Sequence, residues 1–418
     1  MSQLTNQADD LPFANRVRTA EFGGSALHVL GRIGRSSFGL GSVAVDLVLH
    51  QTAEGLRSTF WCVDSADEIE WVVRSAGLPA DRIRRFHSHM GKLSYSPDME
   101  HAVKITAATE LPIVIHQHSL WTALSRVTER WRRYGVPTVV SAQGTLDRFP
   151  LSKSRWKKRL AMLAYEARNL ERASCLQACG DQEVANYRDL GLKNPIAVVP
   201  NGISAKWMNS RGDPLAFRAK YEVPGEMRIM LFISRITPKK GLPMLIEALS
   251  GLKRHLREWI VLIAGVDECE HQATVEELIH RHDLERYVRV IGPVYGDDKR
   301  NAYEAADLFV LPTHSEGNPM VVLEALGAGV PVVTTRGAPW RDLVPYQCGW
   351  WTEISTDAIG QALAEALQLP QSALAARGLR GLELVRRNYD WSQIARQTIR
   401  LYEWLGGRGP QPGFVLTC

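Results

Sequence analysis

The sequence has 418 residues, of which 45% are hydrophobic and 23% charged, and its formal net charge is +5 at pH 7. This length allows two ordinary domains, and this composition is typical of a globular protein and excludes an intrinsically disordered chain. The first residues include acids and amides where a secretory signal needs an apolar core, and no apolar run is long enough to span a bilayer. We therefore expect a cytoplasmic protein.

Short apolar runs rich in β-formers alternate with longer helical patterns along the whole chain. They fall at residues 26–30, 58–63, 112–116, 137–142, 196–200, 228–234, 259–265, 288–292, 307–312 and 330–335. Strands that alternate with helices predict parallel sheets in an α/β fold, and ten strands are too many for one sheet of usual size. We therefore expect two doubly wound domains.

The domain boundary is predicted at VVPNGIS, because Pro200, Asn201 and Gly202 together break regular structure. The first domain would then cover residues 1–198 and the second 199–388. The segment 389–405 has helical periodicity, and we expect it to pack back on the first domain. The Gly- and Pro-rich tail at 406–418 should be frayed.

Six cysteines are scattered through the sequence, and no two of them form a C-x-x-C pair. This spacing fits reduced thiols better than a disulfide framework or a zinc site, so we expect no metal.

Positive charge is concentrated between residues 126 and 159, which contain ten basic residues and two acids, with Trp131, Tyr134 and Trp156 among them. Basic and aromatic residues on one helix face suit the headgroup layer of an anionic membrane. A solvated basic face is the alternative. No nucleic-acid-binding module surrounds this stretch, so nucleic acid is not an expected partner.

The stretch SEGNPMVVLEALGAGVPVV, residues 315–333, contains two carboxylates eight positions apart. The preceding strand should end near Thr313, Asn318 should cap a helix that begins at Pro319, and Glu316 should lie in the loop between them. Glu324 is then inside a largely apolar helix, where an unpaired charge costs several kcal/mol.

Ligands of open α/β sheets bind at the edge where this helix begins. Carboxylates at this edge can hold sugar hydroxyls, and the amides of Met320 and Val321 can face an anion. A capping acid followed by a salt-bridged glutamate is the alternative for Glu316 and Glu324.

A second motif, SRITPKKG at residues 234–241, follows the strand 228–234 and precedes a helical pattern. Arg235 and Lys240 therefore also lie at a sheet edge. An arginine fork and a lysine point charge around a glycine turn suit a diphosphate and could stabilise a departing nucleotide diphosphate without a metal. An exposed basic loop is the alternative.

Together, R-x(4)-K and E-x(7)-E resemble the donor site of retaining glycosyltransferases of family 4. Their GT-B fold consists of two doubly wound Rossmann-like domains that face each other across a cleft. The resemblance extends to residues 291–312, to PNGIS and to the helix at 391–405. The segments HQHSLW, QGTLD, GAPW and CGWW resemble members that build bacterial surface polysaccharides, including lipopolysaccharide.

The resemblance implies a role for each matching residue. Arg235 and Lys240 would hold the donor diphosphate, Glu316 the sugar hydroxyls and Glu324 the ribose. His118 would lie by the reacting centre, so the catalytic set would be Glu316, His118, Arg235 and Lys240. The remaining donor contacts would come from Asn318, Pro319, Met320, Val321, Gly292, Val294, Gly39 and Gly41, and Gln143 would join His118 on the acceptor side.

The implied reaction moves a hexosyl group from a UDP- or GDP-sugar to a saccharide acceptor that is lipid-linked at the cytoplasmic face of the inner membrane. It needs no cofactor and no metal. The sequence departs from the family pattern at Gln143, where His or Arg is frequent, at Asn318, where the family is commonly apolar, and at Ser204, where Asp is frequent. The nucleobase, sugar, linkage and acceptor are not fixed by these motifs.

Three other functions are compatible with parts of the sequence. GLGSVA at residues 39–44, with Asp64 after the next strand, matches the G-x-G-x-x-A fingerprint of an NAD-dependent oxidoreductase, although a loop separates it from its strand. A nucleotide-sugar epimerase would share the fold. A non-catalytic sugar-nucleotide-binding subunit would share the donor site.

Overall fold

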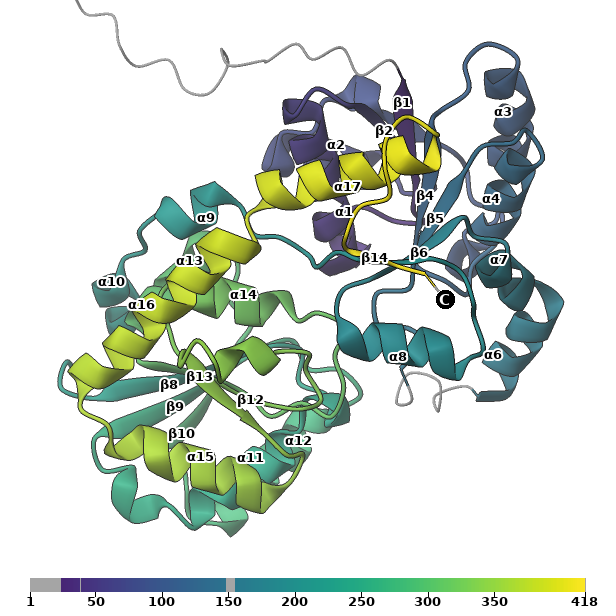
Figure 1. Ribbon diagram of the computed structural model, residues 1–418. Coiled ribbons are helices and arrows are strands. Elements are labelled where there is room, and N and C mark those ends of the chain that lie inside the picture. Colours follow the sequence, from purple (N-terminus) through teal and green to yellow (C-terminus); the bar gives the residue numbers. More distant parts are fainter. Residues whose placement is uncertain (1–23, 38, 148–154, 418) are drawn as a thin grey trace, which may run out of the picture.

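The computed structural model describes residues 24–37, 39–147 and 155–417, which form two α/β units (Figure 1). The first unit is built on an eight-stranded sheet with the order β14-β7-β6-β5-β4-β1-β2-β3. Its strands are β1 Ser25–Val29, β2 Arg57–Cys62, β3 Ile83–Arg85, β4 Val114–His118, β5 Thr138–Ser141, β6 Cys175–Ala178, β7 Ile196–Val198 and β14 Val415–Leu416.

Helices cover both faces of this sheet. They are α1 Gly39–Ala53, α2 Ala66–Ala76, α3 Pro97–Ala107, α4 Leu124–Arg132, α6 Arg155–Ala161, a π-helical turn Met162–Glu166, α7 Ala167–Glu171 and α8 Asp181–Asp189, with short 3-10 turns at Arg35–Ser37, Ala80–Arg82 and Gly91–Leu93. Helix α1 packs with the last helix of the chain on one face, and α3 and α4 pack on the other.

The second unit has a six-stranded parallel sheet with the order β10-β9-β8-β11-β12-β13. The strands are β8 Arg228–Ile233, β9 Trp259–Ala264, β10 Val288–Gly292, β11 Leu308–Leu311, β12 Val332–Thr335 and β13 Gly349–Thr352. The helices are α9 Ala205–Asn209, α10 Pro214–Lys220, α11 Leu242–Ser250, α12 His271–Arg281, α13 Gly296–Ala305, α14 Met320–Gly327, α15 Thr356–Gln368, α16 Gln371–Asn388 and α17 Trp391–Leu405, with 3-10 turns at Pro238–Lys240, Lys253–His255 and Arg341–Leu343.

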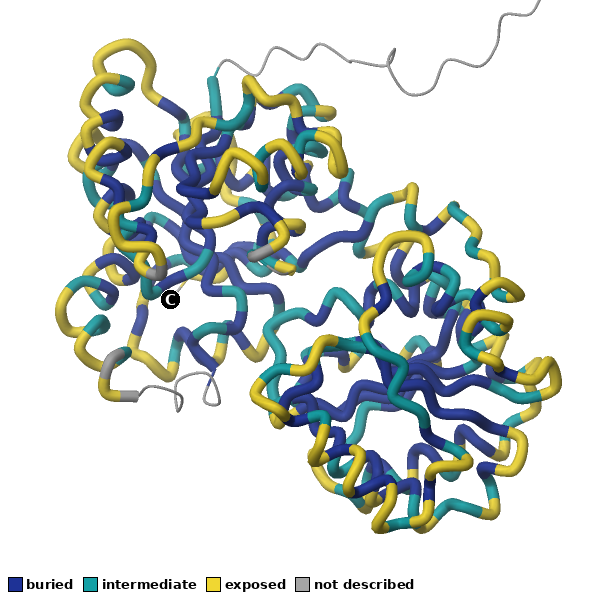
Figure 2. The backbone as a smooth tube through the Cα atoms, turned by 180° about the vertical axis from the view of Figure 1, so that it is seen from behind, coloured by how far each residue is buried: buried dark blue, intermediate teal, exposed yellow. Residues whose placement is uncertain are grey.

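Both sheets follow the doubly wound order 3-2-1-4-5-6, which confirms the predicted fold class. Their central strands are buried on both faces, as Figure 2 shows by the dark backbone inside each unit. The chain reverses its direction of winding between β1 and β4 and again between β8 and β11. Because ligands of such sheets bind at these switch points, each unit has one edge where a site is expected.

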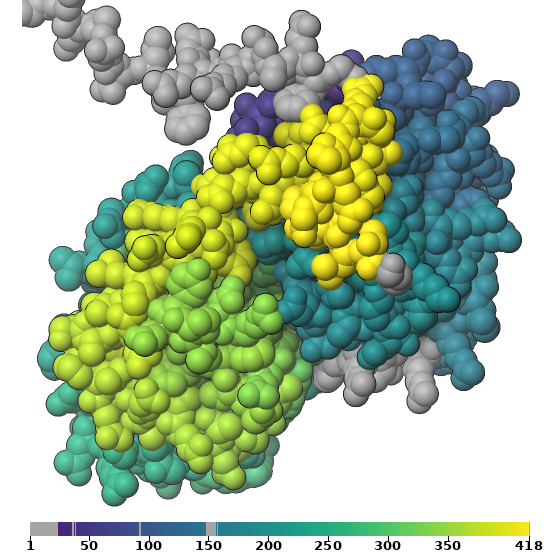
Figure 3. All heavy atoms as spheres, viewed as in Figure 1, coloured from purple at the N-terminus to yellow at the C-terminus, as the bar shows by residue number. Residues whose placement is uncertain are grey.

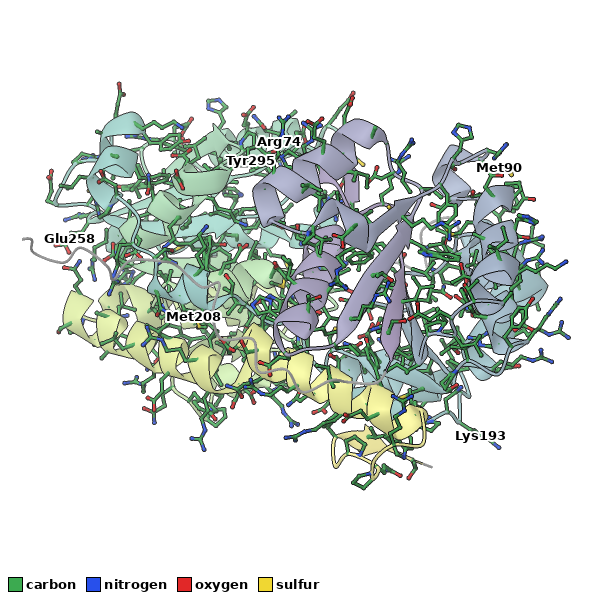
Figure 4. All side chains as sticks on the ribbon, turned by 90° about the horizontal axis from the view of Figure 1, so that it is seen from above. Arg74, Met90, Lys193, Met208, Glu258 and Tyr295 are labelled. Carbon is green, nitrogen blue, oxygen red and sulfur yellow. The ribbon has the colours of Figure 1, made fainter. Side chains whose placement is uncertain are left out.

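Helix α17 joins the two units. It follows α16 on the second unit and packs against α1 of the first, where Trp391, Ile394 and Tyr402 are buried. Figure 3 shows the C-terminal segment over the junction on this face. In the view from above in Figure 4, α16 and α17 run along both units, from the end marked by Glu258 towards the end marked by Lys193.

The ten predicted strands are present, but four others were missed: β3, β6, β13 and β14. The prediction of a frayed tail was wrong, because Val415 and Leu416 pair antiparallel with β7. The predicted start of the helix after Asn318 was also wrong by one residue. Helix α14 begins at Met320, and Pro319, which has no side-chain hydrogen bond to offer, is its N-cap.

Candidate functional site

The two sequence motifs of the second unit meet at the switch point between β8 and β11. The Thr313 hydroxyl and the His314 amide both lie within hydrogen-bond distance of the carbonyl of Lys239, at 3.1 and 2.9 Å. Gly241, with φ of +69°, makes this approach possible, because a Cβ there would lie 1.9 Å from the carbonyl oxygen of Pro312. The loops 234–241 and 312–319 are therefore held as one structure.

Lys240 and Glu316 form an ion pair inside this structure. Lys240 Nζ lies 2.5 Å from Glu316 Oε1, and the side chains are only 8% and 11% exposed. The Thr313 hydroxyl oxygen lies 3.0 Å from the same carboxylate oxygen, so its single proton can go either to Glu316 or to the carbonyl of Lys239. Two residues predicted to bind different parts of the donor thus satisfy each other, so a ligand diphosphate would have to compete with Glu316 for Lys240.

Two more cations stand beside this pair. Burial lowers the pKa of Lys239, while the nearby Glu316 carboxylate opposes that shift. Arg235 lies closer to solvent, with Nη1 2.8 Å from Glu268 Oε2 and both side chains about two-fifths exposed. Sequence reasoning missed Lys239, although the Lys-Lys pair in SRITPKKG could have indicated it. The site therefore offers three basic side chains to an anion.

Glu324 has its own partners in the second unit. Its Oε1 lies 2.6 Å from Lys299 Nζ, and the Tyr303 hydroxyl donates to its Oε2 at 3.0 Å. Its carbonyl accepts from the indole of Trp207 at 3.0 Å. A lysine from α13 therefore compensates the charge of this carboxylate inside an apolar helix. This arrangement is the salt-bridged alternative that the sequence left open for Glu324. Lys299 and Tyr303 were missed because their pairing with Glu324 depends on the packing of α13 against α14.

The remaining donor residues of the second unit lie around the same edge. Met320 and Val321 form the first turn of α14, and Asn318 and Pro319 precede it in the loop from β11. Gly292 ends β10 with φ of +73°, and Val294, two residues later, is buried. Because β10 is the outermost strand, Gly292 and Val294 are separated from Glu316 by β9, β8 and β11.

In the first unit, GLGSVA lies within α1 and not in a turn between strand and helix. Gly39 begins the helix, and a Cβ on Gly41 would lie 2.7 Å from the Ile33 carbonyl oxygen. Asp64 accepts from the amides of Ile33 and Gly34 at 2.9 and 2.8 Å. Asp64 therefore holds the loop after β1, and the position of both glycines within α1 argues against the dinucleotide-binding alternative.

His118 ends β4 at the switch point of the first sheet and is 1% exposed. Its ring stacks on His116 with centroids 4.1 Å apart, and its Nε2 lies 2.9 Å from Nδ1 of His28. Burial lowers the pKa of His28 to about 4 and holds that of His118 well below the ordinary value, so both rings are neutral at pH 7. Sequence reasoning missed His28 and His116, because buried histidines within strands form no recognisable sequence motif.

These three histidines are also the group of described residues whose ligand atoms lie close enough to hold a metal, within 4.8 Å of one another. Both ring nitrogens of His116 are already paired, with the Tyr402 hydroxyl at 2.6 Å and the Ser141 hydroxyl at 2.7 Å. His28 is paired at both nitrogens as well, with His118 and Gln51. Binding a metal would break these hydrogen bonds, so the donor set does not fit a resident ion.

The loop after β5 in the first unit contacts the loop 312–319 of the second. Gly144 and Gly317 approach so closely that a Cβ on Gly144 would lie 2.7 Å from Cα of Gly317. The Ser315 hydroxyl donates to Asp147 Oδ2 at 2.9 Å, and burial raises the pKa of that aspartate. Sequence reasoning did not find Asp147, although it ends the quoted segment QGTLD.

A cavity of 230 Å³ lies beside this contact, lined from both units. It is large enough for about one sugar ring, and its lining includes Asp147, Asn186 and Glu316. Gln143 takes no part in it. Its amide exchanges hydrogen bonds with Asn201 at 3.3 and 3.2 Å, which places it against the segment between the two units. Its role on the acceptor side stays a prediction.

Comparison with known proteins agrees with this two-unit arrangement. The family described as Glycosyl transferase 4-like domain matches residues 38–202, and the family described as Glycosyl transferases group 1 matches residues 215–377. A D-inositol 3-phosphate glycosyltransferase of Kineococcus radiotolerans is 29% identical over 255 residues, which are 57% of this chain and 58% of that protein. The chain therefore spans a little over half the length of that curated relative.

Two solved structures share the fold over 91% of this chain and the whole of the other. One is Anabaena Alr3699/HepE in complex with UDP and glucose, with a TM-score of 0.71 and 18% identity. The other is WaaG, a glycosyltransferase involved in lipopolysaccharide biosynthesis, with a TM-score of 0.65 and 17% identity.

Two doubly wound domains with their switch points turned towards a shared junction define the GT-B class of protein. The chain belongs to the glycosyltransferases of this fold, with a first domain of the Glycosyl transferase 4-like family and a second of the Glycosyl transferases group 1 family. Within the described residues, no helix combines the length and the apolar character that a transmembrane span requires.

Proposed function

We propose that the protein transfers a hexosyl group from a UDP- or GDP-sugar to a saccharide acceptor, with retention of the anomeric configuration and without a metal. The observation that carries this proposal is the set of Lys240, Lys239 and Arg235 around Glu316 at the switch point of the second sheet. A nucleotide diphosphate needs cations at such an edge, and a sugar needs a carboxylate beside them. The binding of UDP by HepE supports the choice of donor.

The geometry suggests how the donor enters. The diphosphate takes Lys240 from Glu316, which leaves the carboxylate free to accept hydrogen bonds from the sugar hydroxyls. Lys240, Lys239 and Arg235 then stabilise the charge that develops on the departing diphosphate, and the N-terminus of α14 adds its dipole. The acceptor attacks from the same face, and Asp147 and His118 of the first domain lie on its side of the junction.

The decisive experiment replaces Glu316 by Gln, which keeps the size of the side chain and removes its charge. We expect loss of sugar transfer from UDP- or GDP-sugars by at least 100-fold, with a melting temperature close to that of the unmodified protein. Glu268→Gln is the matched control, because it changes the carboxylate that pairs with the exposed Arg235. Near-normal turnover by a folded Glu316→Gln protein would refute the donor-site assignment.

Lys240→Ala tests the phosphate contact separately. The variant should bind UDP at least tenfold more weakly, whereas its affinity for uridine should change little, since uridine has no phosphate to place against the lysine. The two affinities are measured by calorimetric titration. Equal losses for UDP and uridine would mean that Lys240 supports the fold of the loop and does not contact phosphate.

A panel of UDP, GDP, ADP, their sugars and NAD(H) distinguishes the alternatives, because a ligand selective for the folded state raises the melting temperature. A shift with one nucleotide diphosphate sugar supports a transferase or an epimerase. Conversion of the free donor to its epimer would identify the latter, and binding without any turnover would identify a non-catalytic subunit. A shift with NAD(H) alone would overturn the proposal.

We further propose that the acceptor is lipid-linked, in surface-polysaccharide assembly at the cytoplasmic face of a membrane, and that residues 126–159 contact this membrane. The arginine face of α4 and α7 supports this. It borders a cavity of 260 Å³ and consists of Arg126, Arg130, Arg133 and Arg168. Trp156, Leu160 and Leu163 stand exposed on the adjoining helix by 64, 58 and 77%. Residues 148–154 lie outside the described part of the chain.

Part of this basic face is already neutralised, because Arg126 and Arg130 share the single carboxylate of Glu100, which offsets one of their two positive charges. Arg133 and Arg168 should therefore provide most of the attraction to anionic lipid. We expect co-sedimentation with phosphatidylglycerol vesicles but not with phosphatidylcholine vesicles, and a marked loss of binding in Arg133→Gln/Arg168→Gln. Unchanged binding by the double variant would assign the face to solvent.

A further inference from the structure

Two hydrogen-bond chains run through the buried layer between the first sheet and helices α1 and α17. One begins at the carbonyl of Val199, which accepts from Gln177 Nε2 at 3.0 Å. Since a carbonyl can only accept, the Gln177 amide is fixed, and its oxygen accepts from the Ser141 hydroxyl at 3.0 Å. Ser141 must then accept from Nε2–H of His116, and the Nδ1 of His116 accepts from the Tyr402 hydroxyl.

The other chain begins on α17, and its donors and acceptors are assigned in the same way. The Thr398 hydroxyl donates to the carbonyl of Ala395 at 2.9 Å, so its oxygen accepts from Gln51 Nε2 at 2.9 Å. This places the oxygen of Gln51 towards the sheet, where it accepts from the Ser58 hydroxyl at 2.8 Å and from Nε2–H of His28 at 2.9 Å. Neutral His28 therefore has its lone pair on Nδ1.

That lone pair faces His118. The two nitrogens are 2.9 Å apart, so Nε2–H of His118 donates to Nδ1 of His28. The proton of the neutral His118 ring is then on Nε2, and its Nδ1 is an acceptor. This nitrogen is buried and has no hydrogen-bond partner among the described residues. An acceptor left in this state is destabilising, and a ligand that donates a hydrogen bond to it would remove that cost.

We propose that Thr398, Gln51 and His28 are positioning residues that hold His118 in the Nε2–H tautomer, so that its Nδ1 accepts a hydrogen bond from a hydroxyl group of the saccharide substrate. The tautomer follows from the structure alone, whereas the saccharide contact rests on the proposed function. His118 ends β4 at the switch point of the first sheet, but it is only 1% exposed, so a saccharide hydroxyl reaches Nδ1 only after the residues that cover it have moved. Its role is that of an acceptor and not of an acid.

The tautomer is measured directly by NMR of protein labelled with ¹⁵N at histidine, because protonated and unprotonated ring nitrogens have well-separated shifts. His118→Gln identifies the signals of His118 by their loss. We expect a protonated Nε2 and an unprotonated Nδ1 at pH 7. A protonated Nδ1 in the unmodified protein would overturn the proposal, because it would mean that the whole chain runs in the opposite direction.

Two variants test whether the chain sets this state. His28→Phe removes the acceptor, so His118 should populate both tautomers, whereas His28→Asn supplies an oxygen at that position and should restore the Nε2–H form. Thr398→Val acts from the far end, because Gln51 loses its acceptor on α17 and its amide can reverse. The His118 signals should change in this variant too, although the two residues do not touch.

Thr52→Val is the matched control. Its hydroxyl also donates to a carbonyl of its own helix, that of Val48 at 2.8 Å, but it is not part of the chain. Its His118 signals should equal those of the unmodified protein. If the His118 signals of both Thr398→Val and His28→Phe equal those of the unmodified protein, the positioning role is refuted even if the tautomer itself is as expected.

The saccharide contact has a separate readout. Addition of UDP-glucose or of glucose should move the Nδ1 signal of His118 in the direction of a hydrogen-bonded nitrogen, and His28→Phe should reduce this effect. A saccharide that binds, by calorimetry, without moving the Nδ1 signal would overturn the contact. Failure of the proposed function would be recognised differently, by absence of nucleotide-sugar binding and turnover while the tautomer remains as stated.

Discussion

Glu324 illustrates how a carboxylate inside an apolar helix is paired without a ligand. It is 16% exposed and accepts from Lys299 and Tyr303. Removing one partner of a buried ion pair leaves the other uncompensated, which is more costly than losing an exposed pair. We expect Glu324→Ala to lower the free energy of unfolding by about 3 kcal/mol, as measured by urea denaturation.

The exposed pair of Glu277 and Arg281 on α12 provides the comparison, because both side chains are more than 60% exposed. Glu277→Ala should change stability by no more than about 0.5 kcal/mol. If Glu324→Ala were as mild and only weakened nucleotide binding, the carboxylate would serve the ribose, as the family resemblance implies, and not the packing of α13 on α14.

Glu183 holds the loop that contains Gly144, and its contribution to the stability of the protein depends on pH. Its carboxylate accepts from the amides of Gly144 and Cys179, at 2.6 and 2.8 Å, and burial raises its pKa from 4.5 to about 7. Because the folded state holds this proton more tightly than the unfolded state, the contribution of Glu183 is fully present below pH 4.5 and is lost as pH rises through 7. The loss amounts to about 3 kcal/mol.

Glu183→Gln should remove this dependence. The difference in unfolding free energy between the variant and the unmodified protein should therefore shift in favour of the variant as pH rises from 4.5 to 7.5. Comparing the two proteins at each pH cancels the buried histidines, whose lowered pKa values act in the opposite direction. A difference that stays constant with pH would show that folding does not raise the pKa of Glu183.

The site residues that could be identified from the sequence are those that lie together in one short loop motif. Arg235, Lys240 and Glu316 follow buried strands, and the carboxyl ends of neighbouring parallel strands meet at one edge, so their proximity could be expected. Lys299 and His28 could not be found in this way. Lys299 meets Glu324 only because α13 packs beside α14, and His28 meets His118 only because β1 and β4 are neighbours in the sheet.

At the level of elements, long apolar runs were easier to recognise than short or exposed ones. Strand β6 has only four residues and includes a glutamine, and β3 has three residues with two exposed arginines. Strand β14 depends wholly on pairing with β7 at the sheet edge, because its two residues have no pattern of their own. Sequence patterns thus indicate burial, while edge strands depend on partners far along the chain.

Gly202 shows why the segment between the domains needs a glycine. A Cβ at this position would lie 2.7–2.9 Å from the indole of Trp391, which is 1% exposed and begins α17. Gly202→Ala should therefore push α17 from its place and destabilise the protein by about 1–3 kcal/mol. The melting temperature measures this effect.

Gly225→Ala is the control for that substitution, since a Cβ at Gly225 would meet nothing within 4 Å. It should leave the melting temperature almost unchanged or raise it slightly, because alanine restricts the unfolded chain. If both variants behave alike, Gly202 serves the flexibility of the segment and not the packing of Trp391.

On the scale of the whole molecule, the contacts between described residues of the two domains include three kinds. Helix α17 packs on α1, Arg341 pairs with Asp181 at 2.7 Å, and the loop containing Gly144 contacts the loop containing Gly317. The last contact lies next to Glu316 and Lys240, so the separation of the domains and the state of the loop 312–319 are coupled. Neither Gly144 nor Gly317 can be replaced by a larger residue unless the backbone moves.

Gly317→Ala tests this coupling. Its Cβ would lie 2.8 Å from the amide nitrogen of Gly144 and 2.9 Å from the carbonyl carbon of Gln143, and neither is the end of a flexible side chain. The domains must therefore separate slightly. Since the cations proposed to hold the donor are all in the second domain, UDP affinity should change little, but kcat for sugar transfer should fall at least tenfold, or about 1.4 kcal/mol in the barrier.

Small-angle scattering should show a larger radius of gyration for Gly317→Ala, while its melting temperature stays close to that of the unmodified protein. Ser315→Ala separates the effect of distance from the loss of a contact, because it removes the hydrogen bond to Asp147 without adding an atom. If Ser315→Ala lowers kcat as strongly as Gly317→Ala, the hydrogen bond to Asp147 matters and the spacing does not. If neither variant changes kcat, transfer does not require the contact between these loops, and the acceptor is positioned by the first domain in a more open arrangement.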